Sequence, residues 1–157
     1  MQLEGRRTPA RFITLLFRMF TVYLNQEMLK LKIGTGQYIF LAELFDKDGR
    51  SQDDLTRSTF LNKANTARAL KKLEDLGYIR RVSDSNDQRV KRAYLEPAAK
   101  QIEEEFWEIL LKWSEILSQN LSKQRKEQLS ADLEKMADNA VAYLTTMKEA
   151  FTTKHET

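Results

Sequence analysis

The sequence contains no cysteine, which excludes disulfide bonds, thiolate metal sites and thiol-based redox sensing. Its single histidine, His155, lies near the C-terminus, and there is no glycine-rich phosphate loop, metal-ligand cluster or nucleophile elbow. The carboxylate runs at Asp53-Asp54 and Glu103-Glu104-Glu105 fit a helix cap and a solvated face better than a catalytic pair. We therefore expect a protein that is not an enzyme and that holds no metal or cofactor.

The sequence also lacks an apolar run of about 18 residues, so we expect no membrane span and no membrane partner. Residues 12–24 are rich in apolar side chains, but Arg18 interrupts them. The basic residues Arg6, Arg7 and Arg11 precede this segment as in a signal peptide, yet no small-residue cleavage site follows. With no secretion signal and no cysteine, we expect a cytoplasmic protein.

Positive charge is concentrated in the middle of the 157-residue chain. Residues 51–95 carry 10 basic and 6 acidic side chains, whereas residues 96–157 carry 8 basic and 12 acidic ones. A basic middle beside an acidic end indicates that only the middle faces a polyanion. The alternative is a solvated surface whose charge is merely uneven.

The first long helix is predicted to begin with Thr8 as N-cap and Pro9 as its first residue, and to run to about Leu31. Its apolar stripe has helical spacing and consists of Phe12, Leu15, Leu16, Met19, Phe20, Tyr23 and Leu24. Further apolar side chains lie outside that stripe, at Ile13, Phe17 and Val22. A helix that is apolar on more than one face usually has more than one partner, which indicates an oligomer.

Three shorter helices are predicted between residues 37 and 77. The first covers residues 37–45 and should bury Ile39, Phe40, Leu44 and Phe45. Ser51 and Asp54 stand at capping-box spacing and open the second. The third follows Asn62 as its N-cap, ends before Gly77, and has a core face formed by Thr66, Leu70 and Leu73.

After Gly77 the sequence predicts a β-hairpin and then two more long helices. Residues 78–82 and 90–95 favour strands, and the polar residues 83–87 between them are typical of a turn. Pro97 restarts a helix, and Ser122 caps the last one. The stripe of the last helix consists of Leu129, Leu133, Met136, Ala140, Leu144, Met147 and Phe151. Because both helices carry such stripes, we expect them to pack as an antiparallel hairpin.

The order of short helix, turn, capped helix and hairpin is typical of a protein that inserts its capped helix into the major groove of DNA. Asn65 can bind adenine through two hydrogen bonds, and Arg68 can do the same with guanine or hold a phosphate. Lys63, Lys71 and Lys72 fit phosphate contacts, which position a protein without reading sequence. The alternative is a helix whose cations merely face solvent.

The hairpin strengthens this hypothesis, because an arginine on a slender loop suits the narrow minor groove of A·T-rich DNA. Asp87 would form an ion pair with Arg89 or Arg92 and so fix the direction of the arginine side chain. The alternative is a solvated turn with a weak surface ion pair. The candidate DNA-binding residues are Ser51, Asn62, Lys63, Asn65, Arg68, Lys71, Lys72, Asp87, Arg89, Lys91 and Arg92.

The spacing Asp87-x-Arg89-x-x-Arg92 resembles the wing motif of MarR-type transcriptional regulators. The resemblance extends upstream through residues 73–81 and covers residues 35–97. It implies a mainly α fold with a small β-hairpin wing, in which a winged helix-turn-helix lobe (35–96) joins a helical dimerisation layer (8–31 and 97–151). It further implies a single domain over residues 1–157, and a homodimer that binds a pseudo-palindromic operator in double-stranded DNA as a repressor.

The sequence also departs from the usual MarR pattern. The family commonly has Ser-Thr-Val-Thr-Arg in its recognition helix, whereas residues 64–68 here are Ala-Asn-Thr-Ala-Arg. The groups that read bases therefore differ, and the operator sequence does not follow from the resemblance. The family often opens its fifth helix with Leu-Thr-x-x-Gly, where this chain has Leu-Glu-Pro-Ala-Ala at residues 95–99. That difference changes a cap but not the topology.

Many members of that family respond to small phenolic or aromatic acids bound between the dimerisation helices and the DNA lobe. Arg18, on an apolar helix, and Tyr38 are the candidate ligand-binding residues here. A buried arginine requires an anion or a carboxylate, and pairing with a glutamate of the same chain is an equal alternative. The competing function for the whole chain is a winged helix that assembles proteins without binding DNA.

Overall fold

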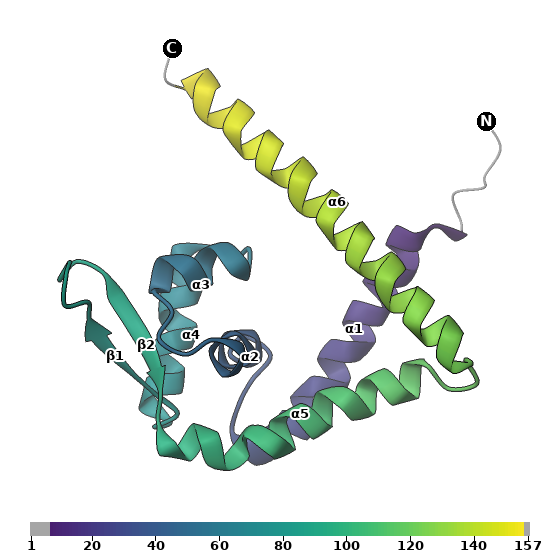
Figure 1. Cartoon of the computed structure of the whole chain (residues 1–157), viewed down its shortest axis with the longest axis horizontal. Coiled ribbons are helices and arrows are strands. Elements are labelled where there is room, and N and C mark those ends of the chain that lie inside the picture. Colours follow the sequence, from purple (N-terminus) through teal and green to yellow (C-terminus); the bar gives the residue numbers. More distant parts are fainter. Residues whose placement is uncertain (1–6, 156–157) are drawn as a thin grey trace. The chain divides into compact units, whose positions relative to one another are not determined.

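The computed structural model describes residues 7–155, and side chains from residue 7 to residue 147. It divides into two compact units, Met1–Ser114 and Glu115–Thr157. The fold is mainly helical with a two-stranded antiparallel wing, as predicted (Figure 1). Its elements are α1 (Pro9–Glu27), the 3-10 helix η2 (Met28–Leu31), α2 (Tyr38–Asp46), α3 (Gln52–Ser58), α4 (Lys63–Asp75), β1 (Ile79–Ser83), β2 (Lys91–Leu95), α5 (Pro97–Leu117) and α6 (Lys123–His155).

Helix α1 starts where the sequence predicts but ends earlier. Thr8 occupies the N-cap with an extended backbone, although its side chain makes no capping hydrogen bond. The α-helix stops at Glu27 and tightens into η2, which ends at Lys32 in the left-handed conformation (φ 55°). Within the predicted stripe only Leu24 is buried, Phe20 and Tyr23 are half-buried, and the other members are exposed. Most of the apolar surface of α1 is therefore uncovered within this chain.

The core of the first unit is built around α2. Phe40, Leu41 and Leu44 are fully buried, while Ile39 and Phe45 are only half-buried. The prediction was therefore wrong to omit Leu41 and to include Ile39 and Phe45 among the buried residues. The reason is that the buried face of α2 is narrower than predicted: Phe40, Leu41 and Leu44 lie within about 100° of the helix circumference, with Ile39 and Phe45 on either side of them. The other fully buried large side chains are Leu24, Met28, Ile33, Leu55, Leu70, Leu73, Ile79 and Phe106.

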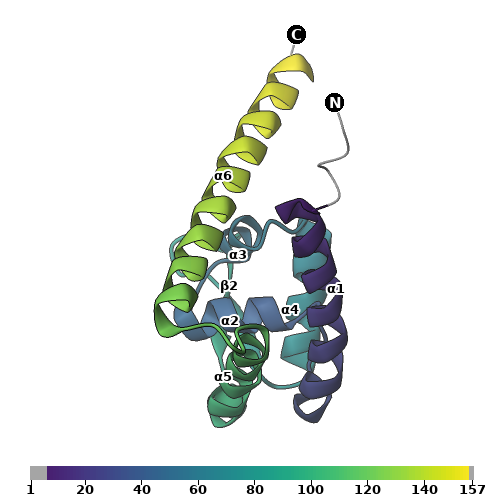
Figure 2. The same cartoon turned by 90° about the vertical axis from the view of Figure 1, so that its right-hand side faces the viewer.

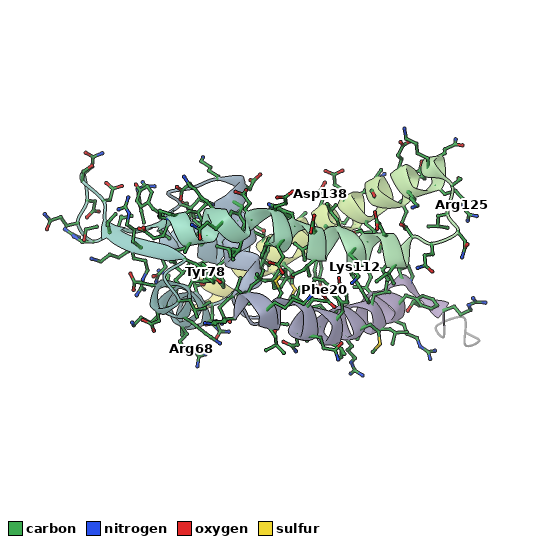
Figure 3. The ribbon with its side chains drawn as sticks, turned by 90° about the horizontal axis from the view of Figure 1, so that it is seen from below. Phe20, Arg68, Tyr78, Lys112, Arg125 and Asp138 are labelled. Carbon is green, nitrogen blue, oxygen red and sulfur yellow. The ribbon has the colours of Figure 1, made fainter. Side chains whose placement is uncertain are left out.

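Aromatic contacts join α2 to the helices on either side of it. The rings of Phe20 and Tyr38 meet edge to face with centroids 5.6 Å apart, and those of Phe45 and Phe106 do so at 5.2 Å. Figure 2 shows α2 running crosswise to α1, and Figure 3 shows Phe20 between α1 and α5. Because aromatic pairs add to the burial of apolar area, α2 holds α1 and α5 against the lobe.

Helices α3 and α4 form the predicted helix-turn-helix, and both predicted caps are present. The backbone N–H of Asp54 donates to the Ser51 hydroxyl at 3.1 Å, and that of Asn65 donates to the Asn62 side chain at 2.8 Å. Gly77 ends α4 with φ 75°, and its N–H donates to the carbonyl of Glu74 at 2.9 Å. The end of α4 is thus fixed by a left-handed glycine, as predicted.

The wing is a β-hairpin that also pairs with the segment before α3. Strands β1 and β2 are antiparallel with Arg81 opposite Ala93. The backbone N–H of Ala93 donates to the carbonyl of Arg50 at 3.0 Å, and Ser51 forms an isolated bridge with Arg92. Strand β2 is therefore flanked on both edges, which ties the wing to the start of α3.

The second unit contains the end of α5, a short turn and α6. Asn120 takes the left-handed conformation (φ 64°) in the turn, and Ser122 precedes α6. Side chains 122–147 of this unit are all exposed, including the apolar stripe as far as Met147; Phe151 lies outside the described side chains. Among the described residues, no helix has the length and apolar character needed to cross a membrane.

Gly49 provides a test of how the wing is attached. Its φ is +73°, and a Cβ there would lie 2.8 Å from the Tyr94 ring on β2. We expect Gly49→Ala to lower the free energy of unfolding by at least about 1–2 kcal/mol, since left-handed backbone alone costs that much. Urea or thermal unfolding measures the change.

Gly36→Ala is the matched control, because Gly36 has no atom within 4 Å of the added Cβ and no positive φ. There the substitution should be neutral or stabilise the protein slightly, because it restricts only the unfolded chain. Equal stabilities for the two variants would contradict the close approach of Gly49 to the wing.

Candidate nucleic-acid interface

Helix α4 presents one polar face outward because its other face is buried. Thr66, Leu70 and Leu73 have no exposed surface. On the opposite side, Arg68 is exposed and reaches away from the ribbon (Figure 3). The remaining exposed or half-exposed side chains of this face are Lys63, Ala64, Asn65, Lys71, Lys72 and Asp75. The burial of α4 thus determines which side chains it offers to a ligand.

Asn65 and Arg68, the two candidates for base recognition, are hydrogen-bonded to each other. The Arg68 Nη2 group donates to Asn65 Oδ1, one helical turn away. A shared hydrogen bond limits the rotamers of both long side chains, so they are partly ordered before any ligand binds. The structure brings these two residues together as the sequence predicts.

The three candidate lysines stand around this pair on the surface of α4. Lys63 Nζ lies 3.3 Å from Asp53 Oδ1 on α3, and Lys71 forms an ion pair with Asp75 one turn on. Lys72 is exposed. Exposed ion pairs contribute little to stability, so a phosphate can displace these carboxylates at small cost.

The tip of the wing holds Arg89 out in solvent, with 96% of its side chain exposed. Asp87 Oδ1 accepts the backbone N–H of Arg89 at 3.0 Å, while its distance to Arg89 Nε is 4.0 Å. Asp87 therefore orders the backbone at the tip and leaves the guanidinium nearly free. An open hollow of about 310 Å³ lies between this tip and the start of α3, lined by Gln52, Asp53, Asp87, Arg89, Val90 and Lys91.

Arg92 pairs with Asp84, and not with Asp87 as one alternative of the prediction had it. It donates through Nε to Asp84 Oδ2 and through Nη1 to the carbonyl of Gly49 at 3.1 Å. The hydrogen bond from Arg92 lowers the pKa of Asp84, and the backbone N–H of Asn86 lowers it further. Register explains the difference, because Arg92 lies opposite Val82 near the turn end of the ladder, close to Asp84, whereas Asp87 lies at the tip. Arg92 thus fastens the wing to the loop before α3.

A second acidic residue that the sequence analysis did not single out ties the wing to α4. Glu74 accepts the backbone N–H of Arg81 at 3.1 Å and pairs with its guanidinium at 2.7 Å. These hydrogen bonds lower the pKa of Glu74. Only the turn at Gly77 places Glu74 beside Arg81, so spacing alone gave no clear signal for the pair.

Two other candidate DNA contacts are engaged within the protein. Ser51 is 7% exposed, and its hydroxyl donates to Asp54 Oδ2 at 2.6 Å, a bond that is the main cause of the lowered pKa of Asp54. Lys91 Nζ donates to the Ser83 hydroxyl at 2.7 Å across the hairpin. The hydroxyl of Ser51 is therefore engaged at the start of α3, whereas Lys91 is exposed and can exchange its partner.

The structure does not bring the two candidate ligand-binding residues together. Arg18 is exposed and lines a shallow hollow with Arg11, Thr14 and Leu15. Tyr38 is half-buried against Phe20, and burial raises the pKa of its hydroxyl. Arg18 and Phe20 are two residues apart on α1 and so face nearly opposite sides. Because Arg18 is exposed to solvent, its charge does not require an anion or a carboxylate beside it.

Comparisons with known proteins show which family shares this sequence and fold. A profile of the MarR family matches residues 32–90. The HTH-type transcriptional regulator BilQ of Clostridium symbiosum is 25% identical over 138 residues, which is 88% of this chain and 96% of BilQ.

Two solved structures share the fold. A MarR transcriptional regulator from Methanosarcina mazei is 32% identical with a TM-score of 0.82, covering 85% of this chain and 96% of that one. A MarR family regulator from Listeria monocytogenes in complex with 26-mer DNA has a TM-score of 0.84 at 20% identity, covering 91% of this chain and 95% of that one.

Proposed function

Because this chain belongs to the MarR family of DNA-binding winged helix-turn-helix transcriptional regulators, we propose that it is a repressor that binds its operator as a homodimer. Members of this family regulate transcription and are not enzymes. The observation that carries the proposal is one surface of the first unit, on which Asn65 and Arg68 of α4 and Arg89 of the wing are all available to a ligand.

In the proposed complex the first turns of α4 enter the major groove. Asn65 and Arg68 would read base edges there, because their amide and guanidinium groups match adenine and guanine respectively. Asn62, Lys63, Lys71 and Lys72 would contact or face the phosphates on either side. The exposed polar face of α4 and the cap at its N-terminus support this orientation.

Arg89 would enter the adjacent minor groove, with Asp87 holding the backbone of the tip. A guanidinium is favoured there because a narrow A·T-rich minor groove has an enhanced negative potential. Two contacts fasten the wing to the rest of the lobe, Arg92 with the carbonyl of Gly49 and Arg81 with Glu74, and set its position relative to α4. Lys91 would add a phosphate contact from β2.

The homodimer would be formed by α1 and by the two last helices. Phe12, Leu15, Phe17 and Met19 on α1 are 45–64% exposed, and the α6 stripe is exposed as far as Met147. So large an apolar surface is unfavourable in water and typical of an interface. Two copies related by a two-fold axis would present two lobes to the two half-sites of a pseudo-palindrome.

We also infer that a small aromatic acid releases the protein from its operator. Tyr38 supports this, because Phe20 lies between it and Trp113, with ring centroids 5.6 Å and 6.0 Å away. A ligand against Tyr38 would therefore press on the helix pair α1 and α5. Arg18 faces another side of α1 and would join the site only as a separate anion contact.

The DNA-binding proposal is tested by gel shift with duplex DNA across a salt series. Binding should weaken by at least about a hundredfold between 50 and 200 mM salt, because phosphate contacts release counterions. Arg89→Ala should weaken binding about tenfold, most at sites with A·T-rich flanks. Lys100→Ala on α5 removes the same charge from an exposed position away from this surface and should change affinity less than twofold.

Two results would count against the proposal. Equal affinities for Arg89→Ala and Lys100→Ala would show that the wing is not in the groove. No binding even at low salt would refute the DNA-binding surface altogether and favour a winged helix that only assembles proteins.

The dimer is tested by light scattering on a variant of α6. Leu133→Glu places a charge in the exposed apolar stripe and should convert a dimer into a monomer, with loss of operator affinity. Lys135→Glu adds the same side chain about 200° around the helix and should leave the dimer intact. A wild-type protein that is monomeric at micromolar concentration would overturn the proposed assembly.

The effector is tested by titrating salicylate while following Trp113 and Trp107 fluorescence. We expect a saturable change in wild-type emission that is reduced in Tyr38→Phe, with Arg18→Ala measured in parallel as the second candidate. The same acid should lower operator affinity. A wild-type response that neither variant alters would remove both residues from the site, and no response would remove the effector.

A further inference from the structure

The turn between α3 and α4 carries two large apolar side chains that do not pack into the core. Phe60 is 50% exposed and Leu61 is 36% exposed. Neither is among the side chains packed against the described core. Single exposed apolar residues are common on protein surfaces. Two in succession, just before a helix that is proposed to read DNA, indicate a binding surface.

Phe60 is also held in a conformation that bulky residues rarely adopt, with φ 56°. The surrounding hydrogen bonds maintain it. The N–H and hydroxyl of Thr59 both donate to the carbonyl of Leu55, at 3.1 and 2.7 Å, and the N–H of Phe60 donates to that of Arg57 at 3.3 Å. Backbone strain kept in place by its neighbours is characteristic of positions with a function.

The position of this turn suggests what it contacts. Leu61 directly precedes Asn62, the N-cap of α4, and the exposed methyl group of Ala64 follows within the first turn of the helix. The patch formed by Phe60, Leu61 and Ala64 is therefore continuous with the surface that carries Asn65 and Arg68. In Figure 1 the wing lies on one side of α3 and α4, and Phe60 and Leu61 belong to the turn that connects these two helices.

Cations flank the patch on both of its helices. Arg57 at the end of α3 pairs with Asp54, and Lys63 at the start of α4 pairs with Asp53. Both cations are largely exposed, with 74% and 79% of their side chains accessible. Exposed cations on either side of the patch can contact phosphates, which would place the patch against the major groove. The apolar group that duplex DNA presents there is the thymine C5-methyl group.

We propose that Phe60, supported by Leu61, contacts thymine methyl groups in the operator and so reads thymine at positions beside those read by Asn65 and Arg68. This rests on the proposed insertion of α4 into the major groove. Phe60 makes no hydrogen bond through its side chain, so it discriminates only by the presence of the methyl group. Thymine differs from uracil by that group alone.

The test uses an operator selected from random duplexes with the wild-type full-length protein. Each thymine is then replaced singly by deoxyuridine, which removes one methyl group and leaves every base-pairing group in place. We expect wild-type affinity to fall about fourfold at each contacted thymine, the value of one buried methyl group converted to a ratio, and not to change elsewhere.

Phe60→Asn removes the ring while keeping a residue that tolerates the left-handed backbone, and Phe60→Gly does the same with no side chain. Both should bind the thymine operator more weakly than wild type and be indifferent to deoxyuridine at the contacted positions. Arg89→Ala is the matched control, because it should bind more weakly overall yet keep the wild-type response to deoxyuridine at those positions. Circular dichroism verifies that the variants are folded.

The outcomes separate this proposal from the proposed function. If the operator binds and deoxyuridine has the same effect on wild type and on both Phe60 variants, the methyl contact is wrong and DNA binding stands. If deoxyuridine has no effect at any position, the contact is equally wrong. If wild type selects no operator, both proposals fail. Binding of another protein at this turn is the remaining use of the patch if the methyl contact is overturned.

Discussion

Burial of one face of α4 is the constraint on which the DNA-binding surface depends. Leu70 and Leu73 have no exposed surface, and burial of each contributes about 2 kcal/mol relative to exposure. This packing prevents the helix from rotating about its axis. Arg68 and Asn65 are thereby committed to the outer face, where they bond to each other. The outer face of α4 is therefore positioned by the hydrophobic core, and substitutions in the core are expected to shift the side chains on that face.

The wing depends on a different kind of interaction, since a two-stranded hairpin alone is marginally stable. Three contacts attach it to the lobe: Arg92 with the carbonyl of Gly49, Arg81 with Glu74, and the backbone bond from Ala93 to Arg50. The charged residues of the wing therefore have two roles. Arg81 and Arg92 on its strands hold its position, and Arg89 at its tip is left available to a ligand.

The apolar side chains of this chain fall into three sets that differ in burial and surroundings. The side chains around α2 form a closed core within one copy, whereas those on the outer faces of α1 and α6 are exposed. The exposed apolar pair Phe60 and Leu61 belongs to neither set, because it precedes the N-cap of α4 and is flanked by the exposed cations Arg57 and Lys63. For the two exposed sets we propose different partners, a second copy for the outer faces of α1 and α6 and the operator for Phe60 and Leu61.

The sequence by itself determined the elements, because caps, periodicity and turn residues act over a few neighbouring positions. Asn62, Ser51 and Gly77 placed the boundaries of α3 and α4 correctly, and the alternation after Gly77 placed the hairpin within one residue. Only the tertiary structure decided the partners. It paired Arg92 with Asp84, left Arg18 exposed, and left Phe60 exposed with a left-handed backbone. Those outcomes depend on strand register, helix rotation and loop docking, which are set by contacts between residues far apart in the sequence.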